Sequence, residues 1–138
     1  MNKPFIICIV DDDEIYKFTM RKTIEMNKLA RKVLIFFDGE EALDFITDNL
    51  GNNQDLPDVI FLDINMPIMD GFQFMQEYIK IKPRVGKKIT IYMVSSSVDA
   101  DDIEKANEIS DIAGYLIKPI KASELNDIIA ELEKASKL

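Results

Sequence analysis

The fold of this chain is decided by the stretch Val59-Ile60-Phe61-Leu62-Asp63-Ile64-Asn65-Met66-Pro67. Its first four residues are apolar and mostly β-branched or aromatic, and such a short run bounded by polar residues predicts a buried β-strand. Asp63 follows directly, so one carboxylate stands at the carboxyl end of an apolar strand. A carboxylate in that place is positioned to react with a ligand.

Five apolar runs of this kind alternate with longer segments of mixed polarity, at residues 5–10, 33–37, 59–62, 89–94 and 115–117. Strands that alternate with helical segments indicate repeated βα units and a parallel sheet. Strands that are apolar on both sides fit a sheet that helices cover on both faces. The sequence therefore predicts an α/β fold built from βα units.

The clearest helical pattern lies near the end of the chain, after the expected N-cap Ser123, at Leu125, Ile128, Ile129 and Leu132. Shorter stripes predict helices after Gly39, at Ala42, Leu43 and Ile46, and after Gly71, at Phe72, Met75, Tyr78 and Ile79. A helix is also expected over residues 15–26, although its apolar residues form no single stripe. The basic stretch 80–88, with Pro83 and Gly86, predicts a solvated loop.

Polar residues follow other predicted strands at the same place as Asp63. Asp11, Asp12 and Asp13 follow the first run, Ser95 to Ser97 follow the fourth, and Lys118 follows the fifth. The carboxyl ends of parallel strands share one edge, and open α/β sheets bind ligands in the crevice outside that edge. We therefore expect an acidic pocket that contains one lysine.

The composition excludes several classes of function. The chain has 138 residues, enough for one domain, and its 25 acidic and 17 basic residues give a net charge of −8, which argues against direct DNA binding. Histidine is absent, which excludes a Ser-His-Asp or Cys-His nucleophile, a His-ligated zinc and autophosphorylation on histidine. Cys8 is the only cysteine, and we interpret it as a small buried hydrophobic residue of a protein in a reducing compartment. The first apolar run is too short for a signal peptide or a membrane span, so a cytoplasmic location is expected.

The run Asp11-Asp12-Asp13 has two interpretations. A single aspartate there would cap the following helix, whereas three like charges in succession repel one another unless a cation lies among them. Oxygen ligands without histidine or thiol favour Mg²⁺, or Mn²⁺ in its place, and Mg²⁺ commonly bridges a carboxylate to a phosphoryl oxygen. Asp63 then becomes a candidate nucleophile, although alone it fits a turn or cap equally well. Lys118 and Ser95, each weak alone, would supply charge and a hydroxyl donor to phosphoryl transfer.

Taken together, these pieces resemble the receiver domain of two-component response regulators over essentially the whole chain. The matching motifs are Val10-Asp11-Asp12-Asp13, Leu62-Asp63-Ile64-Asn65-Met66-Pro67 with Met69-Asp70-Gly71, Met93-Val94-Ser95-Ser96, and Gly114-Tyr115-Leu116-Ile117-Lys118-Pro119. The resemblance implies a flavodoxin-like three-layer (βα)5 fold with a parallel five-stranded sheet in the order 2-1-3-4-5. It also implies a cis bond between Lys118 and Pro119.

The resemblance assigns a role to each site residue. Asp63 is similar to the phosphoacceptor, Asp12 to the direct Mg²⁺ ligand and Asp11 to a ligand acting through water. The backbone carbonyl of Asn65 would complete the protein ligands. The remaining roles are Ser95 and Tyr115 as the switch pair, Lys118 as the partner of the phosphoryl group, and Asn65 and Ser97 as positions that tune the lifetime of the aspartyl phosphate.

Other classes fit less well. A haloacid-dehalogenase-like phosphatase also uses an aspartate nucleophile, but it needs a second aspartate two residues later, where this chain has Asn65. A flavodoxin-like FMN protein would need phosphate-cradling donors in the first loop, where this chain has three aspartates. A scaffold with a degenerate site would lack the acceptor, lysine and hydroxyl that are all present here.

The sequence thus predicts a stand-alone receiver, similar to chemotaxis regulators, over residues 1–138 and without an output domain. A histidine kinase or histidine phosphotransfer protein would supply the phosphoryl group, and the chain would catalyse its own phosphorylation and dephosphorylation rather than act as a conventional enzyme. An unknown downstream protein would bind the surface formed by residues 98–107, 115–117 and the last helix. The alternative for Tyr115 is an exposed aromatic residue with no switching role.

Overall fold

The computed structural model describes residues 3–96 and 98–136 of the chain. Parallel strands form one sheet in the order β2-β1-β3-β4-β5, which confirms the predicted flavodoxin-like topology. The strands are β1 Ile6–Val10, β2 Lys32–Phe36, β3 Val59–Asp63, β4 Thr90–Ser95 and β5 Ile112–Ile117. The helices are α1 Glu14–Met26, α2 Gly39–Asp48, α3 Gly71–Ile81, α4 Ala100–Asn107 and α5 Ala122–Ser136, with short 3-10 turns η1 Asn53–Asp55 and η2 Lys82–Arg84.

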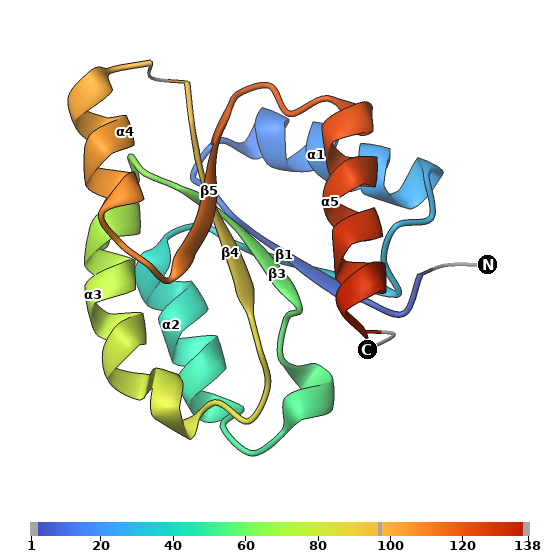
Figure 1. Ribbon diagram of the computed structural model, residues 1–138, viewed down its shortest axis with the longest axis horizontal. Coiled ribbons are helices and arrows are strands. Elements are labelled where there is room, and N and C mark those ends of the chain that lie inside the picture. The colour runs from blue at the N-terminus through green and yellow to red at the C-terminus, as the bar shows by residue number, and fades with distance from the viewer. Residues whose placement is uncertain (1–2, 97, 137–138) are drawn as a thin grey trace.

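The sheet is the middle of three layers. Figure 1 shows α1 and α5 on one face and α2, α3 and α4 on the other. The alternation along β1 explains why both faces are apolar: Ile7 and Ile9 pack in the cluster under α1 and α5, whereas Cys8 and Val10 pack in the cluster under α2 and α3. Burial raises the pKa of the Cys8 thiol, in keeping with its predicted role as a buried hydrophobe.

Three details of the prediction were wrong. The helix α5 begins at Ala122, so Ser123 lies inside it; Glu124 instead closes the first turn by accepting a hydrogen bond from the Lys121 backbone N–H at 3.0 Å. Ile79 is 42% exposed, and Phe74 takes the buried place on α3. The strand β5 begins at Ile112, three residues before the predicted 115–117 run, because a strand at the sheet edge tolerates Ala113 and Gly114.

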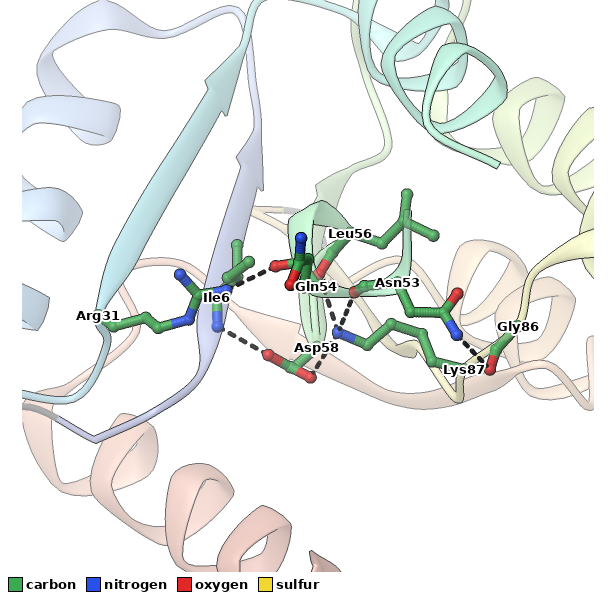
Figure 2. Close-up of polar contacts among 8 residues, drawn as sticks. All are labelled: Ile6, Arg31, Asn53, Gln54, Leu56, Asp58, Gly86 and Lys87. Carbon is green, nitrogen blue, oxygen red and sulfur yellow. Dashed lines mark hydrogen bonds and ion pairs between the residues drawn. The ribbon is translucent and has the colours of Figure 1, made fainter. Parts of the chain in front are cut away.

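The loop that enters β3 is fastened to the loop that enters β4. Figure 2 shows the Lys87 ammonium between Asp58, at 2.8 Å, and the backbone oxygens of Leu56 and Asn53, at 2.9 and 3.2 Å. The other carboxylate oxygen of Asp58 accepts a hydrogen bond from the Ile6 backbone N–H at 2.8 Å. The stretch 80–88 was predicted as a solvated loop, but its residues 80–84 belong to α3 and η2. Its Lys87 fixes the amino-terminal edge of the sheet.

Candidate functional site

The register of the sheet brings the predicted site residues to one edge. Val10 pairs with Leu62, Asp63 with Val94, and Ser95 with Ile117. The residues that end these strands, or directly follow them, are Asp11, Asp63, Ser95 and Lys118. The edge predicted from the apolar runs is thus the edge at which these residues lie.

The short segment after β3 can return this close to the sheet only because residue 71 is glycine. A Cβ atom at Gly71 would lie 2.5 Å from the backbone oxygen of Asp63. The Gly71 N–H donates to the Ile64 backbone oxygen at 2.9 Å, and the Asp70 side chain caps α3 in a capping box with Gln73. These contacts fix the backbone around Asp63.

Three of the four candidate aspartates form a cluster. Asp11, Asp12 and Asp63 each offer a carboxylate oxygen, and these atoms lie within 4.8 Å of one another. Asp13 belongs instead to α1, where its side chain caps the helix and accepts a hydrogen bond from the Tyr16 N–H at 3.0 Å. The capping interpretation of the Asp11-Asp12-Asp13 run therefore holds for Asp13, whereas Asp11 and Asp12 lie in a cluster that could hold a metal ion.

Asp63 lies in an environment that disfavours its charge. Its side chain is 7% exposed, and burial, followed by the charge of Asp11, raises its pKa to about 6. The Lys118 ammonium and a hydrogen bond from the Ile64 N–H act in the opposite direction. A cation bound beside these like charges would therefore stabilise the charged form of the Asp63 carboxylate.

Lys118 joins the two buried carboxylates. Its Nζ lies 2.7 Å from Asp11 Oδ2 and 3.6 Å from Asp63 Oδ1. Burial lowers the pKa of Lys118, but the hydrogen bond to Asp11 and the nearby negative charges outweigh this and raise it overall, so the ammonium stays protonated. The Lys118-Pro119 bond is cis, as the resemblance implied.

The remaining predicted residues are Ser95, Tyr115, Asn65 and Ser97. Ser95 is buried at the end of β4, and its backbone oxygen accepts a hydrogen bond from the Lys118 N–H at 2.9 Å. Tyr115 is partly buried and packs against the core. Asn65 is exposed beside Asp63, whereas Ser97 lies outside the described residues.

Sequence reasoning missed Tyr16, which belongs to the site. The Lys118 Nζ lies 4.5 Å from the centroid of the Tyr16 ring. Burial, followed by the charges of Asp11, Asp63 and Glu124, raises the pKa of the Tyr16 phenol. The available signal was its position: three residues after the cap Asp13, Tyr16 lies in the first turn of α1, beside the acidic cluster.

The residues present fit a divalent cation. Asp11, Asp12 and Asp63 supply hard oxygen donors within bridging range, and a positive charge there would offset the repulsion that raises the pKa of Asp63. Asp11 also contacts Lys118, so one side of the cluster is already partly neutralised. The geometry defines a small acidic site suited to phosphoryl chemistry.

Comparison with known proteins shows the family to which the chain belongs. The model of the response regulator receiver domain matches residues 7–130, so the chain belongs to the receiver domain family of two-component signalling. It is 27% identical over 131 residues to the probable methanogenesis regulatory protein FilR2 of Methanothrix harundinacea, covering 95% of this chain and 83% of that protein.

Two solved structures show the same fold. A response regulator receiver protein from Dyadobacter fermentans is 31% identical, with a TM-score of 0.80, and the match covers 93% of this chain and 97% of that one. The Mn²⁺-bound form of the response regulator Rcp1 is 23% identical, with a TM-score of 0.71, and the match covers 94% of this chain and 92% of that one. Within the described residues, no helix has the length and apolar character needed to cross a membrane.

Proposed function

We propose that Asp63 accepts a phosphoryl group from a phosphohistidine on a histidine kinase or a histidine phosphotransfer protein. The observation that carries the proposal is the position of Asp63: a shielded carboxylate with two further aspartates within 4.8 Å and the Lys118 ammonium 3.6 Å from its oxygen. Catalysis of phosphoryl transfer consists mainly of positioning and charge neutralisation, which these groups supply.

The reaction is an in-line displacement. An oxygen of Asp63 forms a bond to phosphorus as the phosphorus–nitrogen bond of phosphohistidine breaks, and the departing imidazole takes a proton from solvent. Lys118 neutralises charge on the phosphoryl oxygens and Ser95 donates a hydrogen bond to one of them. A divalent cation, Mg²⁺ or the Mn²⁺ found in Rcp1, held by Asp11, Asp12, Asp63 and the backbone carbonyl of Asn65, would supply further positive charge to these oxygens.

The chain itself would speed this transfer and the later hydrolysis, so a small phosphodonor should suffice as a substrate. Incubation with acetyl phosphate and Mg²⁺ should add one phosphoryl group, measured as intact mass, and omission of the cation or the change Asp63→Asn should abolish the gain. Asp13→Asn is the matched control, because Asp13 caps α1 and lies outside the cluster. Undiminished loading of Asp63→Asn would refute the assignment.

The rate of hydrolysis is proposed to depend on Asn65 and Ser97. Asn65 is exposed two residues beyond Asp63, and a longer side chain there is proposed to alter the access of water to the aspartyl phosphate. We expect Asn65→Lys and Ser97→Glu to change the decay rate of the aspartyl phosphate while loading remains possible. Unaltered decay in both variants would exclude this role.

The output is proposed to pass through Ser95 and Tyr115 to the surface of α4, β5 and α5. The phosphoryl group gives Ser95 a new acceptor, and Tyr115 then turns inward, so phosphorylation biases a two-state element. Val98 and Ile117 are 74% and 39% exposed near this surface and offer apolar contacts to a downstream protein. NMR shifts that stay confined to the phosphorylation pocket on adding beryllofluoride, with Tyr115 and residues 98–107 unmoved, would reject the mechanism.

Three further expectations belong to the same proposal. Residues 1–138 would form one receiver domain, which would act in the cytoplasm and without direct DNA binding. Its net charge of −8 supports the last of these. A phosphotransfer screen against purified histidine kinases of the source organism would identify the donor.

A further inference from the structure

Tyr16 forms one wall of the space that holds the Lys118 ammonium. The ammonium contacts Asp11 at 2.7 Å and Asp63 at 3.6 Å, and it lies 4.5 Å from the centroid of the Tyr16 ring. The ring is fixed at the start of α1, because the Tyr16 N–H donates to the capping side chain of Asp13 at 3.0 Å. The lysine is therefore bounded by carboxylates and by an aromatic face from another element.

This wall matters because lysine is a flexible residue. Its long stem gives the ammonium many positions, and holding it in one costs side-chain entropy. The Lys118 side chain is only 17% exposed, and a cation over an aromatic face is attracted more strongly when water is excluded. The ring thus favours the position from which the ammonium reaches the oxygen of Asp63.

The hydroxyl of Tyr16 does not contribute to this contact. Its oxygen is buried and has no hydrogen-bond partner among the residues that the structure describes. The face of the ring, and not the phenol group, is therefore the part of Tyr16 that meets the lysine.

Another contact between a lysine and an aromatic ring, formed by two residues of α1, provides a contrast. The Lys22 Nζ lies 5.6 Å from the centroid of the Phe18 ring, and Phe18 is 62% exposed. That pair lies in solvent and contacts neither Asp11 nor Asp63 through any interaction found in the described residues. The same kind of contact on one helix is thus present both at the site and away from it.

We propose that Tyr16 is a positioning residue for phosphoryl transfer, whose ring face holds the Lys118 ammonium within reach of the accepting oxygen of Asp63. This inference rests on the proposed function of Asp63 and Lys118. It gives the first turn of α1 a part in the chemistry beyond the capping of the helix.

The test varies the electron density of the ring at constant shape. Phenylalanine and its mono-, di- and trifluorinated forms are placed at position 16, and the rate of loading by acetyl phosphate with Mg²⁺ is measured. The logarithm of the rate should fall steadily with each fluorine. Tyr16→Leu should load roughly three- to tenfold more slowly than wild type, and Tyr16→Phe should restore most of the rate.

A packing role alone would not produce this pattern, because the fluorinated rings are nearly equal in size. A rate that is independent of fluorination would overturn the proposal, and so would a loss in Tyr16→Phe as large as that in Tyr16→Leu, which would transfer the role to the hydroxyl. The control is Phe18→Leu, which removes the solvent-exposed pair and should leave the loading rate unchanged.

A second measurement does not depend on phosphorylation. The ε-methylene protons of Lys118 should show an upfield ring-current shift in the wild type and in Tyr16→Phe, and lose it in Tyr16→Leu. Absence of that shift in the wild type would refute the contact itself. If the shift is present but Asp63→Asn still loads, the proposed function fails while the Tyr16–Lys118 contact stands, so the two failures are distinguishable.

Discussion

The strand β3 has an aspartate at each end, and the two residues have opposite surroundings. Asp58, which precedes the strand, receives the Lys87 ammonium at 2.8 Å on one oxygen and the Ile6 N–H at 2.8 Å on the other. Asp63, which ends it, lies 3.6 Å from an ammonium that is closer to Asp11. Asp58 therefore stabilises the fold at one edge of the sheet, whereas Asp63 remains available for chemistry at the other edge.

The surroundings of Asp58 and Asp63 differ because different groups lie at the two edges of the sheet. The amino-terminal edge joins loops, and there Lys87 and Asn53 fasten the segment before β3 to the segment before β4 (Figure 2). The carboxyl-terminal edge collects carboxylates, and their repulsion raises the pKa of Asp63. One edge is therefore electrostatically satisfied, whereas the other holds uncompensated negative charge.

The largest effect is expected from breaking the satisfied edge. Asp58→Ala leaves the Lys87 ammonium and the Ile6 N–H without their carboxylate, and hydrogen bonds to a partly buried charge contribute substantially to stability. We expect a loss of about 2 kcal/mol in the free energy of unfolding, measured by urea denaturation.

The matched control for this change is Asp55→Ala, in the exposed turn η1 of the same loop, which should alter stability by less than about 0.5 kcal/mol. Equal losses in Asp55→Ala and Asp58→Ala would show that the loop as a whole, and not the Asp58 contacts, stabilises this edge.

The second-largest effect is expected at the carboxyl-terminal edge of the sheet, where a substitution should raise the free energy of unfolding instead of lowering it. In metal-free buffer at pH 8, Asp63→Asn should stabilise the fold by about 1 to 2 kcal/mol, because it removes a buried charge beside Asp11. Urea denaturation with a chelator present measures this. A destabilised Asp63→Asn under these conditions would mean that the carboxylate is better satisfied than its surroundings indicate.

The difference in stability between Asp63→Asn and the wild type should depend on pH in a defined direction. The pKa of Asp63 rises from 3.8 to about 6 on folding, so between these values the folded protein holds a proton that the unfolded chain releases. The free energy of unfolding of the wild type therefore falls as pH rises through this window, relative to Asp63→Asn. The advantage of the variant should be complete above pH 6 and should shrink toward zero near pH 4.

A smaller effect is expected from the cation. Mg²⁺ that binds only the folded state stabilises it by mass action, by about 1 kcal/mol at a concentration several times its dissociation constant. Asp12→Asn removes one of the clustered oxygens and should reduce the rise in melting temperature, while Asp13→Asn should retain it. Equal rises in the wild type and in Asp12→Asn would exclude the cluster as the metal site.

Much of the fold was predictable because the strands at the centre of the sheet are almost wholly apolar. The run before Asp63 fixed the place of β3, and motifs shared with a family supplied the strand order. The helix α1 was harder to interpret, because Ile15 and Phe18 are exposed at 80% and 62% while Lys17 is buried. Lysine covers apolar surface with its stem, so the stripe cannot be read from hydrophobicity alone.

The site was predictable where residues follow strands directly, and less so elsewhere. Asp11, Asp63 and Lys118 adjoin strand ends, so the sheet alone brings them together. The separation of Asp13 from Asp12 depends on where the helix begins, and the contact of Tyr16 with Lys118 depends on how the first turn of α1 lies relative to the segment after β5. Neither is encoded in the spacing of the sequence.

The most direct test of the account asks which carboxylate receives the phosphoryl group. Borohydride reduces an aspartyl phosphate to homoserine, so peptide mapping after loading with acetyl phosphate and reduction reveals the modified position. The account predicts homoserine at position 63 alone, with Asp58 at the other end of β3 untouched. Homoserine at position 58, 11 or 12, or none at position 63 in a protein that has gained one phosphate, would contradict it.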